Sequence, residues 1–434
     1  MATELRAIRP HPVFIFLVCL LLFFLKSPDA VLYPQFWAED GAIFYAQQFG
    51  KNWPQLTTPY AGYIHFIPRM IAWLAIPIKP LYVPLFYNVA AIIIDSLCVV
   101  YAFKYLSFMY GATAALISFF LLPTVGDIYG TMTNIQWFLQ FSLVLSVLQP
   151  GANSETPPAP ARMFVISALI IVACLTGPFC VIDCAAILLL FVITFLLNNH
   201  GASLHNIVPE KMTYALGEVK QSIQPFRLIA LSIGALLQVS VMISQTVRTP
   251  NLEYALTIAD RANFDLLDSQ SLYVQTINHP LYWLHVVILL ICILICLANT
   301  VIFFTTPSYK FGVTLILLAI GAAQPVFAYM KQHTPNTLTP VSHYYYFFGV
   351  ICFCSFGLIV NKLLPQHQRS ILIASCMILA CVLGWKPQYL SRPFLIPMNW
   401  SRFAEEISAA DHDVIVPLNP DWRADIRMAR TYIE

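Results

Sequence analysis

Long apolar runs, separated by shorter polar segments, dominate this sequence. A bilayer core about 30 Å thick needs roughly 20 helical residues to cross it, or 17–25 with tilt and snorkelling ends. Such runs, some only with their flanking residues, occur at 10–30, 84–103, 109–126, 134–150, 162–178, 180–198, 228–246, 281–304, 311–329, 344–361 and 370–386. The pattern predicts an all-α polytopic membrane protein with about eleven transmembrane helices.

A shorter apolar run at 64–78 is ambiguous. It is about fifteen residues long, carries Arg69 in its middle and contains Pro68 and Pro77. Its polar and apolar faces suit a helix that lies in the headgroup plane. Leaving it there also gives the inner loops the larger share of Lys and Arg. We therefore predict an interfacial helix here, with the N-terminus of the chain in the cytoplasm and its C-terminus outside.

This topology places most of the polar sequence on the outer side. A first outer loop, 27–83, precedes the second span, and a polar tail, 387–434, follows the last one. We predict a transmembrane domain over 1–386 that includes this loop. The tail is too short for an independent domain, and we expect it to pack on the outer loops.

Composition agrees with a membrane protein and excludes several other classes. Hydrophobic residues make up 59% of the chain and charged residues 10%, against about 45–50% and about 25% in soluble domains. The formal net charge is +2, and no basic stripe is present, which excludes nucleic acid as a partner. The 11 cysteines lie in or beside apolar runs, so they predict neither a disulfide framework nor a zinc site.

Two adjacent acids, Glu39 and Asp40, stand just after the first span in "FWAEDGAIFYAQQF" (36–49). A carboxylate at the membrane surface can act as a general base on an acceptor hydroxyl. Neighbouring helical residues point about 100° apart, so only one of the two can face a given atom. Asp40 also precedes Gly41 and an apolar run, where an N-cap aspartate is common. The residues leave the choice between a cap and a base open.

Further motifs lie in the outer segments: "PYAGYIHFIPR" (59–69), "GDIYGTMTNIQWFLQ" (126–140) and "VIVPLNPDW" (414–422). With "WAEDGAIF" (37–44), they resemble bacterial polytopic glycosyltransferases of the GT-C class, which take sugars from polyprenyl-phosphate donors. The subgroup most similar is the serotype-converting O-antigen glucosyltransferases. The resemblance covers the whole topology, but its sharpest motifs lie in the first third of the chain.

The resemblance implies roles for several residues. An acid in the first outer loop acts as the base in that class, and this role carries over to Asp40 or Glu39. A cation near the donor phosphate is matched best by Arg69, with Lys331 as a second candidate. Related sequences often carry an arginine beside an aromatic residue where this chain has His343 and Tyr344 in "SHYYYFF" (342–348). A neutral histidine supplies no permanent charge, so this departure puts the second phosphate contact in doubt.

The outer segments also hold residues suited to binding a sugar. Aromatic platforms combined with amides and carboxylates are the usual partners of sugar hydroxyls. Candidates for the donor or acceptor sugar are Tyr63, His65, Asp127, Asn134, Gln136 and Trp137. The alternative is that Asp127 and Asn134 only cap helix ends.

Two acids, Asp95 and Asp183, lie inside apolar runs. Intramembrane carboxylates are costly and often functional, so they favour a transporter or flippase of lipid-linked glycans as an alternative. Each could instead bond Ser side chains or backbone groups on neighbouring helices. A structural scaffold without chemistry is a third reading.

The sequence thus predicts an inverting hexosyltransferase in the bacterial inner membrane, with its active site on the periplasmic side. Its expected partners are an undecaprenyl-phosphate sugar, with glucose as the expected sugar, a hydroxyl of O-antigen or another envelope glycan, and the bilayer. No cofactor is required by the residues, and a divalent cation at the phosphate is left open.

Overall fold

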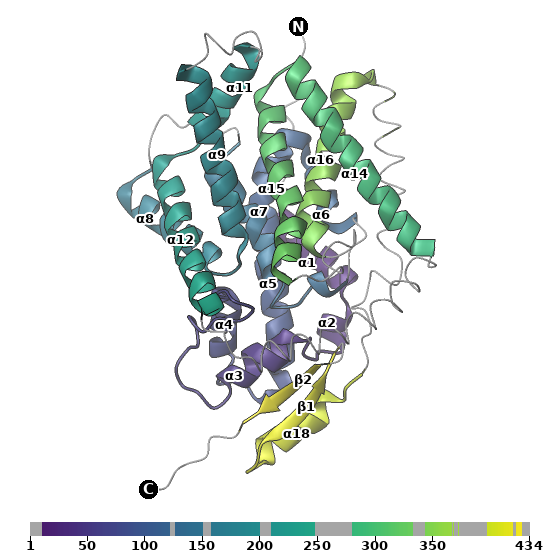
Figure 1. The fold of residues 1–434 in the computed structure, drawn as a ribbon. Helices are drawn as coiled ribbons and strands as arrows, with labels where there is room; N and C mark the ends of the chain where they lie inside the picture. Colours follow the sequence, from purple (N-terminus) through teal and green to yellow (C-terminus); the bar gives the residue numbers. More distant parts are fainter. Residues whose placement is uncertain are drawn as a thin grey trace.

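The computed structural model describes residues 11–121, 126–150, 158–199, 210–247, 280–332, 343–366, 397–419 and 422–427, together with residues 368 and 372. They form a bundle of helices with a small two-stranded sheet beyond one end of it (Figure 1). The helices of the bundle are α1 (Pro12–Lys26), α5 (Val83–Tyr110), α6 (Ala112–Leu121), α7 (Ile135–Leu148), α8 (Pro160–Cys174), α9 (Phe179–Asn199), α11 (Glu210–Gln221), α12 (Pro225–Val247), α14 (Pro280–Thr305), α15 (Tyr309–Gln332) and α16 (Tyr346–Leu363).

The described helices confirm the all-α polytopic membrane class. Five are long and apolar enough to cross a bilayer: Pro80–Tyr110, Phe179–Leu197, Pro225–Gln245, Tyr309–Ala328 and His343–Leu363. Shorter apolar helices cover Pro12–Lys26, Ile135–Leu148, Pro160–Cys174 and Leu289–Thr305. Nearly all of the predicted span 370–386 lies outside the described residues.

The predicted span 109–126 differs from the structure at its start. Residues 109 and 110 belong to α5, which runs on past Lys104 and ends at Gly111. Gly111 has a φ of +92°, a conformation that glycine adopts at little cost, so the chain turns there and α6 begins anew. The Lys104 ammonium lies 5.0 Å from the centroid of the Tyr105 ring.

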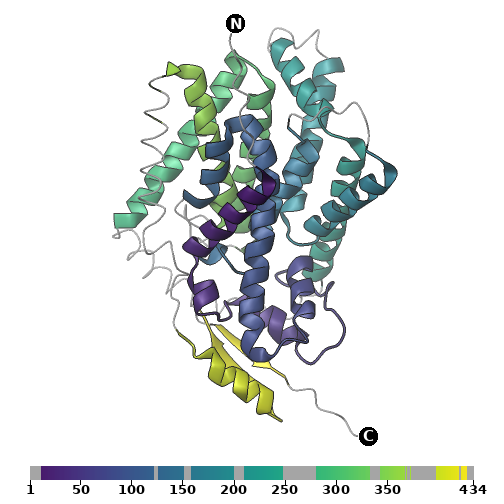
Figure 2. The ribbon, with the colours of Figure 1, turned by 180° about the vertical axis from the view of Figure 1, so that it is seen from behind.

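The centre of the bundle is an aromatic core between α1, α5, α6 and α7. Figure 2 shows α1 lying across α5 on the side opposite to the view of Figure 1. Phe23 of α1 packs edge-on against Phe120 of α6 at 5.0 Å and Phe138 of α7 at 5.1 Å between ring centroids. Large rings packed in this way stabilise the ends of the helices that carry the outer loops.

The first outer loop folds into short pieces: α2 (Asp29–Leu32), the π-helical η1 (Asp40–Tyr45), α3 (Ala46–Gln48), α4 (Phe66–Leu74) and the 3₁₀ turn η2 (Pro80–Tyr82). The nine residues of α4 span about 14 Å, too short to cross a bilayer. This length agrees with the predicted interfacial helix. Gln238 of α12 holds the start of α4 by accepting from Ile64 N at 3.0 Å and donating to Ile64 O at 3.1 Å.

The C-terminal segment packs on this loop. It consists of α18 (Trp400–Ala409) and the antiparallel strands β1 (Val414–Leu418) and β2 (Trp422–Ile426), with Leu418 opposite Trp422. Ala38 N donates to Asn419 O at 2.6 Å. A Cβ on Gly41 would come 2.7 Å from Leu418 Cδ1, so this glycine of the "WAEDG" motif permits the close approach of β1. The sequence analysis expected contact with the outer loops but no strands.

Candidate active site

A cavity of about 400 Å³ lies between the first outer loop and the ends of α7, α9 and α15. This volume is within the range of ligand pockets, roughly 300–1,000 Å³. Most of the predicted site residues line it: Glu39, Tyr63, His65, Asp127, Asn134, Gln136, Trp137 and His343. Asp40 and Arg69 are not among the lining residues, and the side chain of Lys331 lies outside the described residues.

Glu39 stands immediately before η1, with its side chain at the cavity wall. The hydroxyl of Tyr60 donates to its Oε1 over 3.5 Å. Burial, with a smaller contribution from the neighbouring Asp40 charge, raises the pKa of Glu39 to about 7. Burial, with the nearby Glu39 charge, also raises the pKa of Tyr60, which keeps its hydroxyl protonated as a donor. A carboxylate with a pKa near the working pH is suited to general-base chemistry.

Asp40 does not line the cavity, and its carboxylate binds residues 132 and 133 in the segment 126–137, which we call the second outer loop. Its Oδ2 accepts from Met132 N at 2.9 Å, and its Oδ1 accepts from Thr133 N at 2.9 Å and Thr133 Oγ1 at 2.5 Å. Only 1% of Asp40 is exposed. Asp40 is therefore not the N-cap of the helix that follows it: Glu39 holds that position, without a side-chain cap bond, and the Asp40 carboxylate binds the turn before α7 instead. We call this arrangement the outer clasp.

Tyr60 and Tyr63 flank a tight turn that forms one wall. Tyr60 N donates to Tyr63 O at 3.0 Å, and Tyr63 N donates back to Tyr60 O at 3.1 Å. The two residues between them, Ala61 and Gly62, have φ values of 50° and 84°, as a two-residue hairpin turn requires. The ring of His65 stacks on Tyr63 with centroids 4.2 Å apart. The motif "YAGYIH" is thus a rigid aromatic wall.

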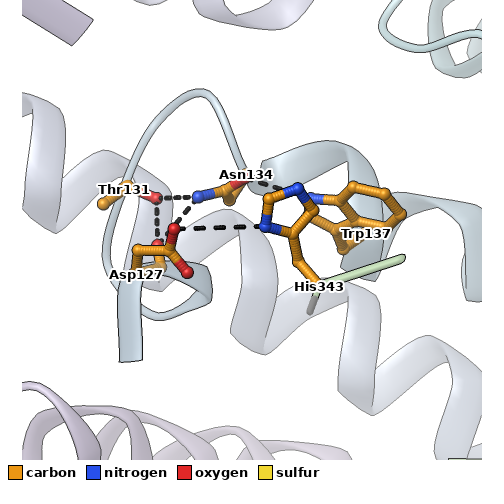
Figure 3. A network of polar contacts seen from close by, with 5 residues as sticks. All are labelled: Asp127, Thr131, Asn134, Trp137 and His343. Atoms are coloured by element: carbon orange, nitrogen blue, oxygen red, sulfur yellow. Dashed lines mark hydrogen bonds and ion pairs between the residues drawn. The ribbon is translucent and has the colours of Figure 1, made fainter. Parts of the chain in front are cut away.

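The second outer loop forms the facing wall through a polar network (Figure 3). Asn134 Nδ2 donates to the Asp127 carbonyl and to Thr131 Oγ1, both at 2.8 Å, and its Oδ1 accepts from Trp137 Nε1 at 3.0 Å. Asp127 Oδ2 lies 4.0 Å from His343 Nδ1, whose ring packs on Trp137. Asn134 is therefore occupied in shaping the loop, while Asp127 and His343 stand together at the cavity.

Arg69 lies one layer behind the cavity wall. It is 1% exposed, and its guanidinium carbon is 5.1 Å from the centroid of the Phe44 ring. None of its three side-chain nitrogens has a hydrogen-bond partner among the described residues. Phe44 in turn contacts His65, which lines the cavity. Burial lowers the pKa of Arg69 to about 10, so it stays charged at neutral pH.

Several aromatic residues of the cavity were not among the predicted site residues. They are Trp37, Tyr60, Phe179, Phe327, Tyr344 and Trp422. Tyr60 and Trp422 stand inside motifs that were noted, "PYAGY" and "NPDW", but no role was assigned to them. Phe179 and Phe327 belong to apolar spans, where no local signal separates a cavity residue from a core residue.

The two acids within the spans differ in their contacts. Asp183 of α9 accepts from Gln140 Nε2 of α7 at 3.2 Å, and Gln140 Oε1 accepts from Gln324 Nε2 of α15 at 2.5 Å. We call these three residues the inner triad. Asp95 of α5 is fully buried, and neither of its oxygens has a hydrogen-bond partner among the described residues.

Within the described ranges, no three His, Cys, Asp or Glu side chains converge as a metal site. Glu39 and Asp127 do line the same cavity, so the two acids could share a cation with a ligand that brings further oxygens.

No protein-family model and no curated protein matches this sequence. A solved structure with a similar fold is the oligosaccharyltransferase of Archaeoglobus fulgidus in complex with Zn and sulfate. Its TM-score is 0.50 at 13% identity, over 92% of this chain and 55% of that chain. Another similar structure is ArnT from Cupriavidus metallidurans bound to undecaprenyl phosphate, with a TM-score of 0.43, 14% identity and coverage of 91% and 69%. The chain thus spans about half the length of the oligosaccharyltransferase, and that likeness shows a GT-C-type fold.

Proposed function

We propose that this protein is an integral-membrane, inverting glycosyltransferase of the bacterial inner membrane. It moves a sugar, glucose in our proposal, from undecaprenyl phosphate to a hydroxyl of O-antigen or another envelope glycan on the periplasmic side. The observation that carries this proposal is a single cavity, at the end of an apolar bundle, that holds Glu39 among amides and aromatic rings. The GT-C-type fold supports the same class.

Glu39 is the base in this proposal. It lines the cavity, whereas both oxygens of Asp40 are bonded to the second outer loop. The Glu39 carboxylate takes the proton of the acceptor hydroxyl while the hydroxyl oxygen bonds to C1 of the sugar. The bond between C1 and the phosphate oxygen breaks on the opposite face, and undecaprenyl phosphate leaves with that electron pair. Attack from the face opposite to the leaving group inverts the configuration at C1.

Asp40 is a positioning residue. Through Met132 and Thr133 it holds the loop that carries Gln136 and Trp137 against the segment that carries Glu39. A carboxylate with several fixed donors is rigid, and reacting groups must be held close to their productive geometry. In this proposal Glu39 therefore takes part in the chemistry, and Asp40 holds the loop in position.

The donor phosphate needs positive charge, and the described lining residues of the cavity include no Lys or Arg. Lys331 follows the cavity-lining Phe327 by one turn of α15, so we propose its ammonium as the phosphate contact. Arg69 adds positive potential from behind Phe44. A neutral His343, whose Nδ1 lies 4.0 Å from Asp127, has one N–H, which in this proposal it donates to a phosphate oxygen; a divalent cation held by Glu39 or Asp127 is the alternative way to neutralise the phosphate.

The remaining lining residues suit a pyranose. The Gln136 amide and the Asp127 carboxylate offer partners for hydroxyls, and the packed rings of Tyr63, His65 and Trp137 give the cavity apolar walls. The donor lipid lies between spans, where about 0.8 kcal/mol per buried CH₂ supplies affinity.

The test is transfer by purified protein in vesicles supplied with undecaprenyl-phosphate glucose and O-antigen lipopolysaccharide. We expect the glycan to gain one hexose by mass, with a new linkage of inverted configuration, and no dependence on an ion gradient. An unchanged glycan under conditions in which the donor is intact would overturn the proposal.

A transporter of lipid-linked glycans is the second candidate, and Asp95 favours it. A fully buried carboxyl without a described hydrogen-bond partner is costly in a span, and transporters place such groups on their pathways. In that case Asp95→Asn abolishes export of lipid-linked glycan, while Glu39→Gln has no effect. The glycosyltransferase predicts the reverse.

A further inference from the structure

The C-terminal hairpin is joined directly to the residues beside Glu39. Trp37 pairs with Asn419 in parallel fashion, and Ala38 N donates to Asn419 O. Trp400 of α18 packs on Phe36 with ring centroids 4.7 Å apart. The position of the hairpin relative to the cavity is therefore set by backbone pairing and ring packing together.

Trp422 is the first residue of β2 and lies on the inner face of the hairpin. Side chains two residues apart share a face of a strand, and Ala424 and Ile426 on this face are 1% and 0% exposed. Trp422 is 36% exposed although it stands on the same face. Trp422 is also the residue of this strand that lines the cavity.

The other tryptophans of the cavity are already engaged. Trp37 is 4% exposed and Trp137 is 2% exposed, and the Trp137 indole donates to Asn134 and packs on Phe179. A ring that binds the apolar face of a sugar needs a free face of its own. Among the described lining tryptophans, Trp422 has by far the largest exposed area for this purpose.

We propose that Trp422 is the platform for a pyranose ring of the acceptor glycan, an inference that rests on the proposed transferase function. The walls formed by Phe179 and Phe327 come from spans, and the donor sugar, tethered to its lipid, enters from their side. The hairpin lies beyond the end of the bundle (Figure 1), on the side from which a glycan outside the membrane approaches. The C-terminal segment thereby contributes the acceptor side of the site.

The experiment compares Trp422→Leu and Trp422→Phe in the purified protein, with undecaprenyl-phosphate glucose as donor and O-antigen lipopolysaccharide as acceptor. Leu keeps apolar volume without a planar ring, whereas Phe keeps a ring. We expect Trp422→Leu to raise the acceptor KM about tenfold, the equivalent of one lost stacking contact, with the donor KM and kcat near wild type. Trp422→Phe should recover most of the loss. Trp53→Leu is the matched control, since Trp53 is 81% exposed and lies outside the cavity lining.

A second readout separates stacking from damage to the hairpin. Slow release of the donor sugar to water needs the donor side alone, and we expect it to be equal in wild type and Trp422→Leu. Equal losses in donor release and transfer, or an unchanged acceptor KM, would overturn the inference while wild-type transfer upholds the proposed function. Wild-type protein that neither transfers nor releases the sugar would defeat the proposed function itself.

Discussion

The outer clasp and the inner triad each contain a buried aspartate, but the two aspartates accept different numbers and kinds of hydrogen bonds. Asp40 is 1% exposed and receives two backbone amides and a hydroxyl. Asp183 is 0% exposed and receives one side-chain amide, from Gln140. Several fixed donors can replace the water around a carboxylate charge, and one amide cannot. The charge of Asp40 is therefore stabilised by its donors, whereas the surroundings of Asp183 suit an uncharged carboxyl group that takes part in a hydrogen bond.

The cavity and the inner triad lie one above the other along the same three helices, α7, α9 and α15. Gln140 lies one turn beyond Gln136 on α7, Asp183 one turn beyond Phe179 on α9, and Gln324 one turn before Ala328 on α15. Each triad residue thus stands one turn deeper in the bundle than a residue of the cavity. In the proposed mechanism the chemistry takes place at the cavity, while the hydrogen bonds of the inner triad connect α7, α9 and α15 one turn beneath it.

The largest effect is expected for Glu39→Gln. If Glu39 is the base, the rate of sugar transfer falls by about 10²–10⁴-fold, because the amide cannot accept the proton. The melting temperature of the protein in detergent should change little, since the hydrogen bond from Tyr60 to the carboxylate is long, at 3.5 Å, and a glutamine oxygen can still accept it. Transfer rate and melting temperature are measured on the same preparation. Wild-type rates in Glu39→Gln would show that the base lies elsewhere.

Asp40→Ala should act first on stability. It leaves the amides of Met132 and Thr133 buried without their acceptor, at roughly 1–3 kcal/mol each, so the free energy of unfolding falls by about 3 kcal/mol. Transfer falls about 10²-fold because the loop with Gln136 and Trp137 shifts. Thermal melting in detergent tests this. Asp411→Ala, at a fully exposed aspartate, is the control and should melt as wild type does; equal melting of both variants would contradict the clasp.

The pH dependence of transfer sharpens the assignment of the base. Glu39 acts as a base only when deprotonated, and its pKa is raised to about 7. The value of kcat/KM should thus rise with pH up to about 7 and fall about tenfold for each unit below it. Rates between pH 5 and 8 test this. A change of slope in the pH profile of kcat/KM near pH 4.5 would indicate a solvent-exposed carboxylate as the base instead.

The smallest effect is expected for Asp183→Asn. The amide oxygen can still accept from Gln140, so transfer should stay within about twofold and stability within about 0.6 kcal/mol, the average for such bonds in membranes. Asp183→Leu removes the acceptor and should cost more. Transfer and melting are measured for both. If Asp183→Asn alone abolished activity, the acid itself would be functional, and the contrast with Asp40 would fail.

The sequence predicts the helical class because apolar runs of membrane length depend only on local composition. The motifs of the outer segments do lie close together in the fold, since most of the predicted site residues line one cavity. The sequence could not decide between Glu39 and Asp40, because the donors that occupy Asp40 come from residues 132 and 133. Arg69 illustrates the same limit: whether a charge on a short helix faces a cavity or lies behind Phe44 depends on tertiary packing.

The bond between Ala38 and Asn419 joins the first outer loop to the C-terminal hairpin, and it has a consequence for biosynthesis. The strand that completes the wall beside Glu39 leaves the ribosome roughly 20–80 s after the "WAEDG" segment, at about 5–20 residues per second. Until then the wall beside Glu39 lacks this strand, so the proposed site is incomplete in a nascent or prematurely terminated chain, and we expect such a chain to be inactive.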